Sequence, residues 1–228
     1  MRNSFHSTRW TLVQRAKGRD ETSRAALSEL CEIYYEPVLR FIEVRTRNPD
    51  TARDLAHTFF EDLLSRESIG SPDPARGRFR SYLLGAVKHF LARQHQASLA
   101  QKRGGDLEAT PLDDQLADPT DDDPQFDRDW AFALIRRAHD TLENEMTSAG
   151  KGCHFSILRP WLDGGPSGSR EDACRELGLE ANALNVAIHR LRERFRTIVR
   201  AEVEATLADP SELRAEFRYL VDLIAQNG

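Results

Sequence analysis

The sequence predicts an all-α protein with two helical domains joined by an acidic flexible linker. Apolar residues recur at three-to-four spacing through most of the 228 residues, which is the period of an amphipathic helix. A stretch rich in proline and aspartate interrupts this pattern once and carries ten acidic residues against one basic residue. We therefore expect domains at 8–103 and 130–201, a linker at 104–129 and a helical extension at 202–228.

Helix signals in the first domain are clear at two positions. Apolar residues spaced for one helix face run through 27–42, and Pro37 within them predicts a kink or a new helix start. Asn48, Pro49 and Asp50 predict a second start, because asparagine caps a helix, proline suits its first position and aspartate favours its positive end.

A long basic helix should run from Arg78 to about Ala97. Its apolar side carries Phe79 and several aliphatic residues at helical spacing. No acidic residue occurs between Asp73 and Asp106, whereas seven basic residues do: Arg76, Arg78, Arg80, Lys88, Arg93, Lys102 and Arg103. Soluble helices normally mix both signs, so this stretch indicates a polyanionic partner, with a solvated basic face as the alternative.

Charge is sorted along the chain, although the total of −5 argues at first against a DNA partner. Residues 1–103 carry a net +6, 104–129 a net −9, 130–201 a net +2 and 202–228 a net −4. Because salt screens attraction to phosphate beyond about 10 Å, the local charge matters more than the total.

A helix-turn-helix is predicted over 169–200. Ser169 can cap a first helix, with Asp172 three residues later in an acidic capping box. Gly178 supplies the left-handed residue of a sharp turn, and Ala173 and Cys174 are small enough for a close helix crossing. A second helix begins near Ala181, with an apolar stripe of Leu184, Ile188, Leu191, Phe195 and Ile198.

The second helix of such a motif presents its first turns to the major groove of DNA. The outward side chains there are Ala181, Asn182, Asn185 and His189. Asparagine can pair with the edge of adenine, and alanine can meet a thymine methyl group. Four arginines lie around the later turns, and some of them should reach phosphates: Arg190, Arg192, Arg194 and Arg196. The alternative is a helix hairpin that packs on another protein.

Several other functional classes find no support in the sequence. Cys31, Cys153 and Cys174 lack the paired spacing of a zinc site or a disulfide framework. We find no phosphate loop and no nucleophile–base pair, so we expect a non-enzyme without cofactor or metal. Neither a signal peptide nor an apolar run of about 18 residues is evident, so we expect a cytoplasmic protein without membrane insertion.

Three segments in this order resemble extracytoplasmic-function (ECF) sigma factors of the sigma-70 family. Region 2.1–2.2, a hairpin that binds the clamp helices of RNA polymerase, resembles YYEPVLRFIEVRTRNPDTARDLAHTFFEDLL. Regions 2.3–2.4, which open and read the minus-ten element, resemble GRFRSYLLGAVKHFLARQHQ. Region 4.2, which reads the minus-thirty-five element, resembles REDACRELGLEANALNVAIHRLRERFR. STRWTLV, GRFRSYLL, AQKRGG and LRPWLDG are similar to a planctomycete-like variant.

The resemblance implies roles for individual residues. The expected polymerase-binding residues are Asp54, Phe59 and Asp62. The expected minus-ten contacts are Arg78, Arg80, Tyr82, Lys88, His89 and Arg93. Phe79 and Tyr82 are both candidates for stacking on an unpaired base, but Phe79 fits the apolar core better, whereas the role of Tyr82 stays open.

Two departures from the family pattern stand out. Asn182 and Asn185 stand where many relatives carry glycine and lysine, which predicts a different promoter preference or weaker binding. The amphipathic extension at 202–228 passes the usual end of region 4, and it either packs on the second domain or binds a regulator such as an anti-sigma factor.

The resemblance predicts a sigma factor that joins core RNA polymerase at promoter DNA and directs transcription initiation. The alternatives are a conventional helix-turn-helix regulator and a polymerase-binding antagonist that does not read promoters.

Overall fold

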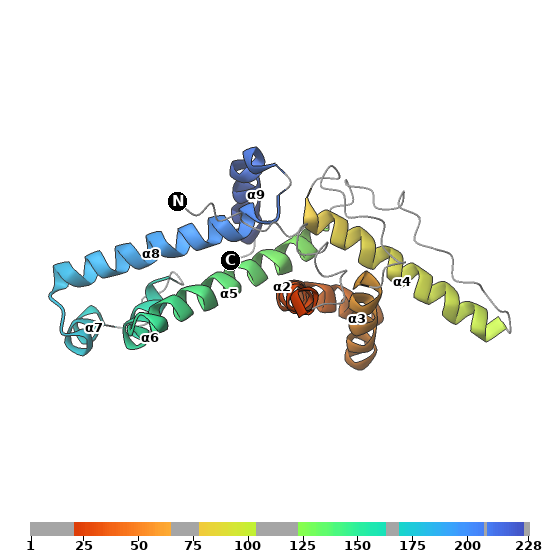
Figure 1. The fold of residues 1–228 in the computed structure, drawn as a ribbon, viewed down its shortest axis with the longest axis horizontal. Helices are drawn as coiled ribbons and strands as arrows, with labels where there is room; N and C mark the ends of the chain where they lie inside the picture. Colours follow the sequence, from red (N-terminus) through yellow and green to blue (C-terminus); the bar gives the residue numbers. More distant parts are fainter. Residues whose placement is uncertain (1–20, 65–77, 104–122, 163–168, 208, 226–228) are drawn as a thin grey trace. The chain divides into compact units, whose positions relative to one another are not determined.

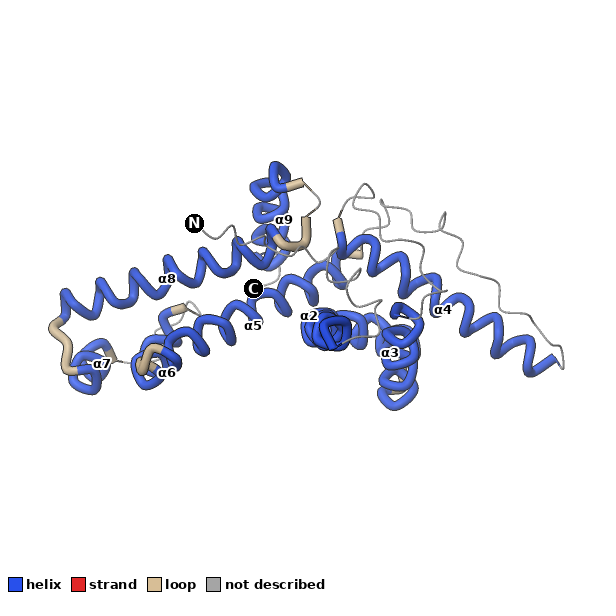
Figure 2. Tube along the Cα trace, viewed as in Figure 1, coloured by secondary structure: helices blue, strands red, loops and turns tan. Residues whose placement is uncertain are grey.

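Helices make up the regular elements in the described part of this protein. The computed structural model describes residues 21–64, 78–103, 123–162, 169–207 and 209–225. Within these ranges every regular element is an α-helix or a short 3-10 helix, and none is a strand (Figure 2). The prediction of an all-α fold is confirmed for this part of the chain.

The first three described helices are α2 (Glu21–Thr46), α3 (Pro49–Leu64) and α4 (Phe79–Arg103) (Figure 1). α2 continues through the buried Pro37, so the predicted new start at this proline is wrong. A proline removes only one helical hydrogen bond, and the buried Val38, Phe41 and Ile42 that follow can hold the helix in place by packing. The start of α3 agrees with the prediction, because the Asn48 side chain accepts hydrogen bonds from two backbone N–H groups at 3.0 Å.

The remaining elements are α5 (Pro124–Ser148), α6 (Gly152–Leu158), η2 (Arg159–Trp161), α7 (Arg170–Leu177), α8 (Ala181–Glu204), η3 (Pro210–Glu212) and α9 (Leu213–Ala225). α5 begins at Pro124, inside the segment 104–129 that the sequence predicts as a linker. Asp123 caps this helix by accepting hydrogen bonds from the backbone N–H groups of Gln125 and Phe126 at 3.1 and 3.0 Å. Residues 104–122 of the predicted linker lie outside the described residues.

The described chain forms two compact units. One contains residues up to Ala133 together with those from Val203 onward, and the other spans Leu134–Glu202. The predicted second domain began at Trp130, but Trp130 is fully buried within the first unit. The carboxy-terminal extension also belongs to the first unit, whereas packing on the second domain was one of the two predicted alternatives.

Each unit has its own apolar core. In the first, aromatic contacts join α2 to α4 through Tyr34 and Phe79, with ring centroids 4.9 Å apart, and α3 to α4 through Phe59 and Phe90 at 5.5 Å. In the second, one cluster combines buried side chains of α5, α6, η2, α7 and α8: Ala138, Leu142, Phe155, Leu158, Trp161, Ala173, Leu184, Ile188, Leu191 and Ile198.

Candidate nucleic-acid interface

The turn between α7 and α8 has the local structure that the sequence predicts. The Ser169 hydroxyl accepts hydrogen bonds from the backbone N–H groups of Glu171 and Asp172, at 3.2 and 3.4 Å. Gly178 ends α7 in the left-handed region with φ of 63°. The Leu179 N–H then bonds to the Cys174 carbonyl at 2.9 Å, which closes the helix end and directs the chain into α8.

Packing orients α8 so that one side faces the core of its unit. Leu184, Ile188 and Leu191 are 1–5% exposed, as the predicted apolar stripe requires. Ala173 of α7 is 4% exposed within the same cluster, so a small side chain occupies the predicted position of close helix contact. The opposite side of the first turns of α8 therefore points to solvent.

That solvent-facing side carries all four of the predicted base-contacting residues: Ala181, Asn182, Asn185 and His189. Each is exposed, and the last three share one face at helical spacing. Val186 is also 47% exposed beside Asn182 and Asn185, although the sequence prediction did not include it. An exposed apolar side chain next to two amides can contact a thymine methyl group.

The arginines of the later turns are not equivalent. Arg190 is exposed and remains available for a phosphate. Arg192 instead donates two hydrogen bonds to the Trp161 backbone carbonyl, at 3.0 and 2.8 Å. This bidentate contact fixes α8 against η2, so a DNA contact of Arg192 would compete with it.

Arg194 forms a bidentate ion pair with Glu145 of α5, at 2.8 and 2.5 Å. The hydrogen bond from Arg194 lowers the pKa of the Glu145 carboxyl, and the same contact raises the pKa of Arg194. Arg196 pairs with Glu193 on its own helix. The predicted phosphate contacts of Arg194 and Arg196 would therefore compete with carboxylates that are already bound.

One contact across the helix-turn-helix was not anticipated. Arg170, the first residue of α7, donates a hydrogen bond from Nη1 to the Asn185 side-chain oxygen on α8 at 2.9 Å. Both side chains are exposed. The sequence contained one indication of this contact. An arginine at the positive end of a helix is locally unfavourable, which suggests that Arg170 has a role other than stabilising its own helix.

Two of the six predicted minus-ten residues are buried in the first unit. Arg80 is 1% exposed and forms ion pairs with Asp127 of α5, at 2.9 Å, and with Glu216 of α9. Burial lowers the pKa of Arg80, against the opposing effect of Asp127. Tyr82 is 8% exposed, with its ring 5.9 Å from that of Phe79. Both side chains belong to the interior of this unit, whereas the predicted DNA contacts need an exposed surface.

The other four predicted minus-ten residues are partly exposed: Arg78, Lys88, His89 and Arg93. Arg78 forms an ion pair with the same Glu216 at 3.0 Å. Arg93 donates a hydrogen bond to Asp62 of α3 at 2.9 Å. Because Arg78 and Arg93 each pair with a carboxylate of the chain, part of the positive charge on this basic face is already neutralised.

The predicted polymerase-binding residues on α3 differ from one another in exposure and in their contacts. Asp54 is exposed, as a surface contact requires. Phe59 is 2% exposed and packs edge-on against Phe90, so it lies in the core of the unit, whereas the predicted contact with polymerase needs an exposed side chain. Asp62 is paired with Arg93, which joins a predicted polymerase contact to a predicted DNA contact in one ion pair.

The carboxy-terminal extension completes the buried charge cluster of the first unit. Glu216 is 0% exposed and contacts both Arg78 and Arg80. The Tyr219 hydroxyl of α9 donates a hydrogen bond to Asp127 at 2.8 Å. The guanidinium of Arg80 also lies over the Tyr219 ring at 5.0 Å. α9 is thus an integral part of this unit.

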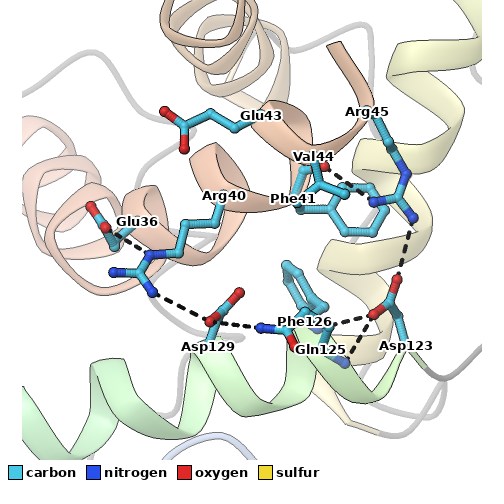
Figure 3. Close-up of a pocket in the computed structure, with 10 residues that line it drawn as sticks. All are labelled: Glu36, Arg40, Phe41, Glu43, Val44, Arg45, Asp123, Gln125, Phe126 and Asp129. Carbon is cyan, nitrogen blue, oxygen red and sulfur yellow. Dashed lines mark hydrogen bonds and ion pairs between the residues drawn. The ribbon is translucent and has the colours of Figure 1, made fainter. Parts of the chain in front are cut away.

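A pocket of about 760 Å³ lies between α2 and α5 of the first unit (Figure 3). Its two arginines are already paired, because Arg40 contacts Glu36 at 2.9 Å and Asp129 at 3.5 Å, and Arg45 contacts Asp123 at 3.3 Å. The hydrogen bond with Glu36 is the main reason that the pKa of Arg40 is raised. These pairs connect α2 to α5 and leave no uncompensated cation in the pocket.

Over the described ranges, the side chains form no cluster of three or more metal-ligating groups. Among the helices described, none is both long and apolar enough to cross a membrane. No family model, curated protein or solved structure matches the chain.

Proposed function

We propose that this protein is a transcription-initiation factor of the sigma-70 family, of the ECF type. It would join core RNA polymerase, recognise promoter DNA and assist strand opening, in the cytoplasm and without a covalent step. The observation that carries the proposal is the helix-turn-helix: a capped α7, a left-handed Gly178 and an α8 whose exposed face bears Asn182, Asn185 and His189. In this proposal that motif reads the minus-thirty-five element.

The amino-terminal unit supplies weaker support. Lys88, His89 and Arg93 of α4 are partly exposed, and in this proposal they contact the minus-ten strand. The exposed Asp54 and the partly exposed Asp62 of α3 are the candidates for a contact with polymerase. A regulatory protein such as an anti-sigma factor would be a further partner.

Promoter-dependent transcription in vitro tests the proposal. The full chain is added to core RNA polymerase and a library of genomic fragments, and run-off transcripts are sequenced. We expect transcripts that begin downstream of a shared two-part motif, and we expect Asn182→Ala to weaken them. Arg175→Ala is the matched control, because Arg175 is exposed on α7 and is paired with Asp172 at 2.7 Å. A library without any factor-dependent start site would overturn the sigma assignment.

A conventional helix-turn-helix regulator is the second candidate. The burial of Arg80 and Tyr82 favours it, since a regulator needs no surface that binds a single strand. Such a protein would bind duplex operator DNA tightly without polymerase. Gel-shift titrations with and without core enzyme separate the two functions, because a sigma factor should need polymerase for high-affinity binding.

A further inference from the structure

The contact between Arg170 and Asn185 fixes the orientation of two exposed side chains. A guanidinium has only hydrogen-bond donors, so the group of Asn185 that faces it at 2.9 Å must be the amide oxygen. The Asn185 amide nitrogen therefore points away from Arg170. One of the five N–H groups of Arg170 is used in this contact, and the others stay available.

Arg170 keeps its positive charge uncompensated. Within the described part of the chain, no carboxylate forms an ion pair with it, whereas Arg175, Arg194 and Arg196 each have one. It also stands at the positive end of the α7 dipole, where a cation is disfavoured. An exposed arginine in this position, held by a neutral amide, fits a site that receives an anionic or electron-rich group.

Apart from the second lone pair of the Asn185 oxygen, the groups that the pair's own hydrogen bond leaves unused are donors. They are the remaining N–H groups of Arg170 and the amide N–H groups of Asn185. In the major groove guanine presents two acceptors, N7 and O6, whereas adenine presents one acceptor and one donor. A surface of donors matches guanine and mismatches the adenine N6 amino group. This changes the preference that the sequence alone predicted for Asn185.

We propose that Arg170 recognises a guanine base in the major groove and that Asn185 is the positioning residue that holds its guanidinium. Because Arg170 belongs to α7, the first helix of the motif shares base recognition with α8. The inference rests on the proposed DNA-binding function and specifies which base this site takes.

Selection from randomised duplex DNA tests the proposal, with the full chain in the presence and absence of core RNA polymerase. We expect the wild-type chain to enrich a guanine at one position, and Arg170→Ala to reduce that preference about tenfold. Arg170→Lys keeps the charge without the planar fork, so it should also lose the preference. Asn185→Ala should weaken it partly, and the Arg175→Ala control should leave it unchanged.

A second measurement identifies the contacted atom. Replacing the selected guanine by 7-deazaguanine removes the N7 acceptor, which should weaken binding of the wild-type chain but not of Arg170→Ala. Circular dichroism confirms that each variant is folded.

Two outcomes would overturn the inference, and they differ in what else they reject. In the first outcome, the wild-type chain selects a motif, but Arg170→Ala lowers the affinity equally for all sequences and reduces the salt dependence of binding by about one phosphate contact. Arg170 then binds the DNA backbone, and only this inference is wrong. If the wild-type chain selects no sequence under either condition, the proposed function is rejected together with it.

Discussion

Arg80 of α4 and Glu216 of α9 form an ion pair in which the two side chains are 1% and 0% exposed. Taking two charges out of water is costly, and that cost is offset by their mutual contact, by Asp127 beside Arg80 and by Arg78 beside Glu216. The pair is therefore more important for the integrity of the first unit than a surface ion pair would be.

Loss of the Glu216 charge should destabilise the first unit strongly. Removing one partner of a buried ion pair is costly, and Glu216→Gln leaves Arg80 with Asp127 as its remaining carboxylate partner and takes the carboxylate from Arg78, so we expect it to reduce the free energy of unfolding by about 3–5 kcal/mol. Urea denaturation followed by circular dichroism measures this change. Glu212→Gln is the control, since Glu212 is exposed and close in sequence. Equal stability of the two variants would contradict the role given to the buried cluster.

Substitution of Arg192 should affect stability more than DNA binding. Lysine cannot reproduce the two hydrogen bonds to the Trp161 carbonyl, so Arg192→Lys should lower the free energy of unfolding of the second unit by about 1–2 kcal/mol. Thermal denaturation provides the measurement. Arg196→Lys is the matched control on the same helix, because Arg196 pairs only with Glu193 near the surface. If the Arg192→Lys protein were fully stable but lost much of its DNA affinity, the structural role of Arg192 would be contradicted and its predicted DNA contact supported.

The Glu145 carboxyl should titrate below its ordinary pKa of 4.5, because Arg194 donates hydrogen bonds to it. A carboxyl whose pKa is lowered by folding adds stability above its ordinary pKa and loses that contribution as the pH falls through the lowered value. The pair is exposed, so the gain is small. Carbon-13 NMR of glutamate carboxyls measures the titration, and Arg194→Ala should return the pKa of Glu145 to its ordinary range. A pKa that stays low in this variant would exclude Arg194 as the cause.

Replacement of Gly178 should strain the turn of the helix-turn-helix. Its φ of 63° disfavours residues with a Cβ atom, so Gly178→Ala should cost about 1 kcal/mol of stability. No heavy atom lies within 4 Å of the added Cβ, so crowding should contribute nothing. Gly178→Asn should cost less, since asparagine tolerates this conformation. Thermal melts of the three proteins rank these effects, and an unchanged Gly178→Ala melting temperature would speak against backbone strain.

Local signals in the sequence predicted local structure well. Asn48 and Ser169 cap their helices through nearby backbone N–H groups, and Gly178 ends α7 in the left-handed region. These features depend on residues within about four positions of one another, so they can be read from a short segment. The buried stripe of α8 follows from helical periodicity in the same way.

Predictions failed where a side chain finds a partner far along the chain. The periodicity of α4 contains no information that Arg80 meets Glu216 of α9. Likewise, Arg192 and Arg194 look like free surface cations until α8 is packed beside η2 and α5. The tertiary contacts must therefore be known before the basic residues that bind within the chain can be told apart from those that can bind a ligand.

The residues up to Ala133 and those from Val203 onward form one unit, and this has a consequence for biosynthesis. The ribosome releases the chain from its amino end, so α2, α3 and α4 emerge long before Glu216 is translated. Until then Arg80 lacks one of its two carboxylate partners. The interior that α2, α3 and α4 help to form is therefore complete only after α9 has been synthesised.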